Sequence, residues 1–128
     1  MARHRQPHHD QRFSRMERVN ELCREILGDE LERLGDDRLE LVTVTHVAVD
    51  PDLRRAVVEF SALGENEDDA ADVLAEHRVA LQAAIARQAR LKRTPELRFR
   101  VDAVMEQGAR IEELLRKDRT LHDDDAGS

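Results

Sequence analysis

The sequence predicts a single α+β domain with the element order α-β-β-α-β and a short final helix. Apolar residues recur every three or four positions before residue 35 and again after residue 64, which is the period of an amphipathic helix. Residues 41–63 are instead rich in valine and threonine, which favour a pleated sheet. A chain of 128 residues has the length of one domain, and its single cysteine cannot form an internal disulfide.

The first helix is expected to begin at Ser14. Ser14 and Glu17 have the spacing of a capping box, in which each side chain satisfies a backbone N–H of the other residue. The helix is expected to end near Gly35, because glycine suits the left-handed conformation that follows many helices. One apolar stripe runs along it and consists of Met16, Val19, Leu22, Cys23, Ile26 and Leu34.

Residues 41–63 are predicted to form an antiparallel hairpin. Asp50 and Pro51 suit the first two positions of a type I turn between the strands. The second strand places one apolar face toward the core, formed by Ala56, Val58, Phe60 and Ala62. The first strand alternates less cleanly, and its expected faces are Val42, Val44 and Ala48 against Thr43, Thr45, Val47 and Val49.

A second helix and a third strand are predicted after Gly64. Acidic residues in "ENEDDAAD" complement the positive end of a helix dipole, and "TP" at 94–95 is expected to end the helix. In the third strand, apolar residues at 97, 99 and 101 would face the core, with Arg98 and Arg100 facing solvent. The pattern of Ile111, Leu114 and Leu115 predicts the short final helix after Gly108.

The expected domain layout follows from these elements. Residues 1–12 would form a flexible basic tail, residues 13–118 the folded domain and residues 119–128 a disordered acidic tail. The sequence shows no long apolar run and no secretory signal, so we expect a cytoplasmic protein without a membrane segment.

Positive charge is concentrated in one part of an acidic chain. The formal net charge is -7, yet residues 77–102 hold seven basic residues and two acidic ones. Basic side chains on the outward faces of a helix and the strand after it should converge and attract phosphate by counterion release. The predicted RNA-contacting residues are Arg78, Arg87, Arg90, Lys92, Arg93, Arg98 and Arg100, joined by Arg15 and Arg18 if the start of the first helix lies nearby.

Two simpler interpretations of these charges stay open. A run of charged residues is often only a solvated face of a helix. Arg98 and Arg100 could equally be surface residues of the strand that pair across the sheet with Glu59.

The three phenylalanines, without Trp or Tyr, leave too few rings for RNA recognition by base stacking.

No arrangement of residues predicts catalysis, a cofactor or a metal site. His4, His8 and His9 lie in the expected tail, without a rigid frame to hold a metal. His46 falls in the middle of a strand and is interpreted as a structural or surface residue, and Cys23 as a small buried hydrophobic residue. We therefore expect a protein that is not an enzyme.

Four segments resemble one protein family when taken in order. They are "RMERV" at 15–19, "VTVTHVAVDPDLRRAVVEFS" at 42–61, "LKRTPELRF" at 91–99 and "EQGARIEELL" at 106–115. Together they make the chain similar to the ribosome-binding factor A family, a family of bacterial assembly factors, from residue 12 to about residue 117.

The resemblance implies a type II KH-like domain with the helices packed on one face of a three-stranded sheet. Ordinary KH domains clamp nucleotides with a G-x-x-G loop, which is absent from this sequence and from the family. The family usually has an Ala-x-Gly kink in its second helix. That position falls on His77-Arg78-Val79, where valine replaces glycine, and a bend is expected there nonetheless.

The resemblance also implies a function and partners. It implies a monomer that binds the immature small (30S) ribosomal subunit and its 16S rRNA and assists late maturation and rRNA processing, including in the cold. Membranes and small-molecule substrates are not expected partners. The alternative is a non-enzymatic protein-interaction module in which RNA binding is incidental.

Overall fold

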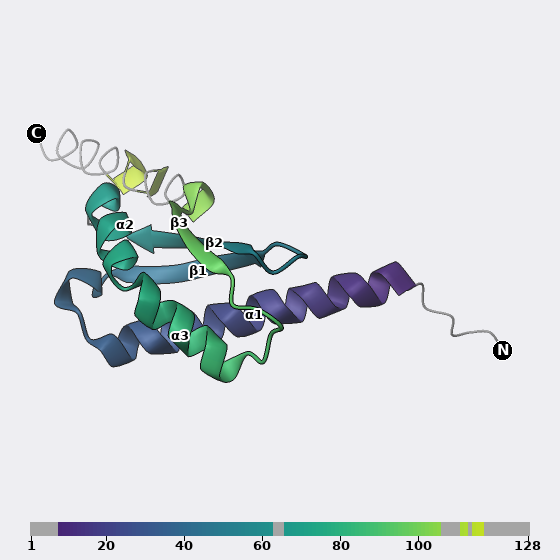
Figure 1. The fold of residues 1–128 in the computed structure, drawn as a ribbon. Helices are drawn as coiled ribbons and strands as arrows, with labels where there is room; N and C mark the ends of the chain where they lie inside the picture. Colours follow the sequence, from purple (N-terminus) through teal and green to yellow (C-terminus); the bar gives the residue numbers. More distant parts are fainter. Residues whose placement is uncertain (1–7, 63–65, 106–110, 113, 117–128) are drawn as a thin grey trace, which may run out of the picture.

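The computed structural model describes residues 8–62, 66–105, 111, 112 and 114–116, with side chains from residue 15 onward. Its elements, shown in Figure 1, are α1 (His8–Leu34), the 3-10 helix η1 (Asp37–Leu39), β1 (Val42–Val49), β2 (Arg55–Ala62), α2 (Glu67–Glu76), α3 (Arg78–Gln88) and β3 (Glu96–Val101). The predicted α+β order is confirmed. Residues 111, 112 and 114–116 are helical. Gly108, residues 1–7 of the tail expected at 1–12, and the whole tail expected at 119–128 lie outside the described residues.

The three strands form one mixed sheet in the order β1-β2-β3. Strand β1 pairs with β2 antiparallel, and β2 pairs with β3 parallel. The helices lie on one face of this sheet (Figure 1). The predicted apolar face of β2 is confirmed, because Ala56, Val58, Phe60 and Ala62 are all buried. Two clusters fill the space between sheet and helices: one joins the sheet to α1 and α3, and the other joins it to α2 and η1.

Helix α1 begins earlier than its capping box predicts. It starts at His8, so the predicted start at Ser14 is wrong and part of the expected tail is helical. Residues 8–13 hold no glycine or proline, so no residue in this stretch breaks the helix. The predicted end is confirmed, since Gly35 has a positive φ of 62° and donates a backbone hydrogen bond to Leu31. The amino-terminal turns of α1 extend past the sheet (Figure 1).

The core face of α1 lies slightly to one side of the predicted stripe. Cys23 and Ile26 are buried as expected, but Leu22 is 39% exposed. Leu27 is buried in its place and Leu31 packs partly against the core. The helix packs mainly against β1 and α3, and this pair of neighbours selects the face.

A β-bulge at Thr45 changes the alternation of β1. The pairing register with β2 shifts between Val44 and His46. Val42 and Val44 are buried before the bulge, and Val47 and Val49 are buried after it. The prediction that Ala48 shares a face with Val42 and Val44 is therefore wrong, because the extra residue reverses the phase of the strand.

The second helical segment is bent at the predicted place. Helices α2 and α3 meet at His77, whose backbone N–H donates to the carbonyl of Leu74, three residues back. His77 Nε2 lies 2.8 Å from Asp36 Oδ2, which ties the bend to the loop after α1. Val79, at the usual glycine position, is 80% exposed. The bend therefore needs no glycine there.

Helix α3 ends before the predicted stop at Thr94-Pro95. Its last residue is Gln88, and the N–H of Ala89 donates to the carbonyl of Ile85. Arg90 then adopts a left-handed φ of 53°, which ends the helix in the manner of a glycine cap. The prediction of a longer helix is wrong because this backbone conformation cannot be read from the residue type.

Candidate nucleic-acid interface

Three segments of the chain meet at one end of the molecule. They are the turn between β1 and β2, the connection between α3 and β3, and the amino-terminal half of α1 (Figure 1). The backbone N–H of Glu96 donates a 2.9 Å hydrogen bond to the carbonyl of Arg54, which joins the hairpin turn to the start of β3. Buried Pro95 fixes the residue before that strand. Basic residues from distant parts of the sequence are thereby held at one end.

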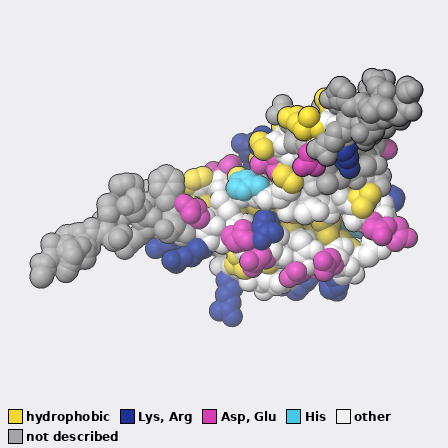
Figure 2. Space-filling view, turned by 180° about the vertical axis from the view of Figure 1, so that it is seen from behind, with side chains coloured by type: hydrophobic (Ala, Val, Ile, Leu, Met, Phe, Trp, Pro, Cys, Tyr) yellow, Lys and Arg dark blue, Asp and Glu magenta, His cyan; other side chains and the backbone are white. Residues whose placement is uncertain are grey.

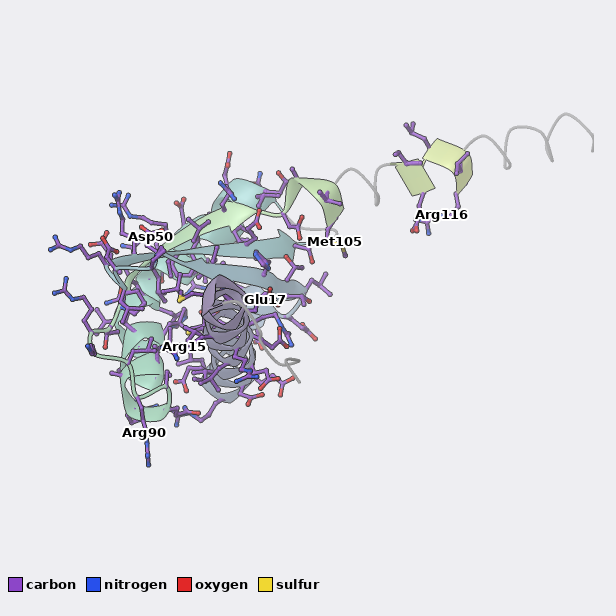
Figure 3. All side chains as sticks on the ribbon, turned by 90° about the vertical axis from the view of Figure 1, so that its right-hand side faces the viewer. Arg15, Glu17, Asp50, Arg90, Met105 and Arg116 are labelled. Carbon is purple, nitrogen blue, oxygen red and sulfur yellow. The ribbon has the colours of Figure 1, made fainter. Side chains whose placement is uncertain are left out.

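We call this surface the basic end. Its members are the exposed cations on these three segments, namely Arg15, Arg18, Arg54, Arg55, Arg90, Lys92 and Arg93. Figure 3 looks at this end and shows Arg15 on α1, Arg90 after α3 and Asp50 at the hairpin turn. Arg54 Nε lies 3.8 Å from Asp52 Oδ2. None of the other six pairs with an acidic residue in the part of the chain that the structure describes.

Sequence reasoning missed Arg54 and Arg55. Both lie in the segment read as a hairpin, where the pattern of the strands drew attention away from their charge. Arg55 is the register partner of Glu96 at the start of β3. A third strand paired parallel to the second places its first residue beside the hairpin turn, so the strand order could have indicated these two residues.

Four predicted contact residues bind within the fold. Arg78 Nε donates to the carbonyl of Leu97 at 3.0 Å, and its guanidinium lies 5.7 Å from the centroid of the Phe99 ring. Arg98 Nε lies 3.0 Å from Glu96 Oε1 on the same strand. Arg100 Nη2 lies 3.2 Å from Glu59 Oε2, so the alternative of cross-strand pairing holds for Arg100.

Arg87 is the fourth of these residues and joins two helices. Its Nη2 lies 3.8 Å from Glu30 Oε1, while Arg33 Nη2 lies 2.9 Å from Glu30 Oε2. The Glu30 side chain is 4% exposed, and the hydrogen bond from Arg33 lowers the pKa of its carboxyl, with a smaller effect from Arg87. Arg87 remains exposed at its outer side and can still face a ligand.

The remaining candidates for chemistry lack a reactive setting. Cys23 is fully buried as predicted, and burial raises the pKa of its thiol. His46 is exposed on β1, as expected for a surface histidine. Within the described residues, no three His, Cys, Asp or Glu side chains are grouped closely enough to hold a metal ion. None of the helices described has the length and apolar run that a membrane crossing requires.

Comparison with known proteins identifies the family of this chain. The family model for ribosome-binding factor A matches residues 15–115. The chain belongs to the ribosome-binding factor A family. The ribosome-binding factor A of Rubrobacter xylanophilus is 42% identical over 106 residues, which cover 81% of this chain and 87% of that protein. The ribosome-binding factor A of Zymomonas mobilis is 40% identical over 111 residues, covering 83% of this chain and 79% of its own.

Solved structures of the family share the fold. The crystal structure of ribosome-binding factor A from Thermus thermophilus matches with a TM-score of 0.64 at 30% identity, covering 67% of this chain and 94% of that one. A homology model of the Thermus thermophilus factor, fitted into a cryo-EM map of its complex with the 30S subunit, matches with a TM-score of 0.54 at 34% identity. That match covers 62% of this chain and 87% of the other. The KH-like fold implied by the resemblance is confirmed.

Proposed function

We propose that this protein is an assembly factor that binds the immature 30S ribosomal subunit and contacts its 16S rRNA through the basic end. It acts as a monomer in the cytoplasm and assists late maturation and rRNA processing, including in the cold. Membership of the ribosome-binding factor A family supports the partner, as does the 30S complex of the Thermus thermophilus factor.

The observation that carries the RNA-binding surface is the convergence of unpaired cations. Six of the seven residues of the basic end make no ion pair within the described chain, so their charge is available to phosphate groups. Arg87, Arg98 and Arg100 border this surface as exposed cations that have partners. Phosphate contacts release condensed counterions from the RNA, which favours binding even though the chain is acidic overall.

The mechanism needs no chemical step. A protein that binds one arrangement of the RNA more tightly than the others shifts the population toward that arrangement. The hydrogen bond from Glu96 to Arg54 holds the hairpin turn beside β3 and so limits the spacing of the cations on these two segments, which suits them to one arrangement of phosphates. The difference in binding free energy between RNA arrangements then favours one course of subunit maturation over the others.

A salt titration of binding to immature 30S subunits tests this proposal. With about six phosphate contacts, affinity should fall about a thousandfold between 50 and 200 mM salt. The variant Arg90→Gln/Arg93→Gln should bind more weakly and show a salt slope that is smaller by about two. A control, Arg24→Gln, removes one cation from the carboxyl-terminal half of α1, outside the basic end, and should keep the affinity and the salt slope of the parent.

The opposite result favours the other function. An affinity that hardly changes with salt, or equal losses in the two variants, would show that the basic end does not contact RNA. The protein would then be an interaction module that recognises a protein component, with RNA binding incidental. Co-sedimentation with immature and mature 30S subunits distinguishes an assembly factor from a general ribosome-binding protein, because an assembly factor is enriched on immature subunits.

A further inference from the structure

A groove runs between α1 and the outer edge of β1, away from the basic end. It encloses about 810 Å³, and its apolar floor consists of Leu31, Leu39, Val42 and Val44. The carboxyl-terminal half of α1 forms one wall and the loop carrying η1 closes one end. Figure 2 shows this side of the molecule, where acidic side chains lie along the lower margin with basic side chains among them and apolar atoms exposed nearby.

One wall of the groove is an unpaired strand edge. Strand β1 is at the border of the sheet, so its outer backbone groups lack a neighbouring strand. Near the hairpin turn, Asn20 Oδ1 accepts a hydrogen bond from the N–H of Val49. No described residue bonds the outer edge in the same way at Val42–Val44, where the groove lies. An extended segment could pair there as a fourth strand.

The other edge of the sheet is capped at Leu97. At β3, Arg78 donates to the carbonyl of Leu97, and the N–H of Leu97 donates to Gln82 Oε1 at 3.1 Å. Helix α3 thus satisfies both backbone groups of Leu97. Proteins commonly cover or cap their strand edges. No described side chain caps the β1 edge in this way at Val42–Val44, where the groove supplies an apolar floor beside the edge.

Gly28 keeps the helical wall of the groove open. A glycine inside a helix costs about 1 kcal/mol relative to alanine. A Cβ at Gly28 would meet no atom within 4 Å, so packing within the protein does not require glycine. The position lines the groove. The lack of a side chain is explained if another chain approaches the helix closely there.

The rim of the groove carries unpaired negative charge. Asp29, Glu32, Asp37 and Glu40 line it, and no described residue forms an ion pair with their carboxylates. Arg24, the basic residue of the lining, is hydrogen-bonded to Glu21. Such a rim repels RNA phosphates and the acidic residues Asp123–Asp125 of this chain, and it attracts lysine and arginine.

We propose that this groove binds an extended, Lys/Arg-rich segment of a partner protein, which adds a strand to the outer edge of β1. Alternate side chains of the segment lie on the apolar floor and reach the acidic rim. The site is independent of the basic end: one surface takes a basic protein segment and the other takes RNA phosphates.

A labelled peptide of alternating lysine and valine is the probe, and the same peptide with glutamate in place of lysine is its control. The lysine peptide should bind the full-length protein in a fluorescence anisotropy titration, and the glutamate peptide should not. In NMR spectra the lysine peptide should shift the amide signals of Val42–Val44 and of Asp29. The variant Gly28→Leu fills the groove, improves helix propensity, and should weaken binding about tenfold or more.

The two surfaces are separated by their own variants. Gly28→Leu should be at least as stable as the parent and keep its RNA affinity, and Arg90→Gln/Arg93→Gln should keep its peptide affinity. Peptide binding that is unchanged by Gly28→Leu, or equal for both peptides, would overturn the proposal. A dimer that Gly28→Leu abolishes would assign the groove to a second copy, and tighter peptide binding after deletion of residues 1–7 would assign it to the chain's own basic segment.

Discussion

Arg78 Nε donates a hydrogen bond of 3.0 Å to the backbone carbonyl of Leu97, and its guanidinium lies over the Phe99 ring. This contact joins the first turn of α3 to the start of β3. The Arg78 side chain is therefore half-buried, although its charge made it a candidate for RNA binding. Among the predicted contact residues, it is the one with the clearest role in the fold.

The first prediction concerns this contact. Arg78→Met keeps the aliphatic stem but leaves the Leu97 carbonyl without its donor, so we expect the free energy of unfolding to fall by about 1–2 kcal/mol. Arg93→Met removes a cation that makes no ion pair among the described residues and should change it by less than about 0.5 kcal/mol. Urea denaturation measures both. Equal stability of the two variants would show that the contact at Leu97 contributes nothing.

Arg90 should show opposite effects on stability and on binding. Its φ of 53° suits glycine, so Arg90→Gly should raise the free energy of unfolding by about 0.5–1 kcal/mol. The same change removes one cation of the basic end and should reduce the salt slope of RNA binding by about one. Arg93→Ala is the control, since it should weaken binding without the gain in stability. A destabilised Arg90→Gly variant would contradict this account of the helix end.

The free energy of unfolding should depend on pH through Asp36, which lies in the loop after α1. Hydrogen bonds from Arg38 and from His77 hold the pKa of Asp36 well below its usual range. Because the pKa is lowered by folding, the stabilisation is complete above the pKa of the unfolded chain, near 4, and is lost as pH falls below it. The difference in unfolding free energy between the parent and Asp36→Asn should therefore narrow below about pH 4.

Asp37→Asn provides the control for this measurement. It removes a neighbouring carboxylate that forms no ion pair with a described residue. Denaturation of all three proteins between pH 3 and pH 7 gives the comparison. A parent-to-Asp36→Asn difference that stays constant over this range would show that the contacts of Asp36 do not stabilise its charged form.

The bend between α2 and α3 should depend on His77 more than on residue 79. Val79→Gly should cost less than about 0.5 kcal/mol, because the valine is exposed and the two residues differ little in helix propensity. His77→Ala removes the contact with Asp36 and should cost about 1 kcal/mol. Thermal and urea unfolding measure which of the two variants loses more stability. A larger loss for Val79→Gly would place the origin of the bend at residue 79.

Patterns with a strict period were predicted well. The alternation of Phe60 with its neighbours identified the buried face of β2, and the alternation after Pro95 identified the outward arginines of β3. These elements follow their period because each has one face against the helices. Two helix ends were predicted wrongly: the capping box at Ser14 lies inside α1, and the conformation of Arg90 ends α3 before the stop expected at Thr94-Pro95.

The candidate site was found in part. The charge run at 90–93 was visible in the sequence, and it forms the centre of the basic end. The contribution of Arg54 and Arg55 depends on parallel pairing of β2 with β3, which no local pattern reports. The partners of Arg78 and Arg100 likewise depend on which strand lies beside which.

The sequence by itself determined the order of the elements and the buried role of Cys23, which depend on residue type and local spacing between neighbouring residues in the chain. The position of the bend came from the resemblance to the family and not from a local pattern. Only the tertiary structure decided the bulge at Thr45, the pairing of each arginine and the open edge at Val42–Val44. Those features come from contacts between segments that are separated in the chain, where packing selects one register from several that the local pattern allows.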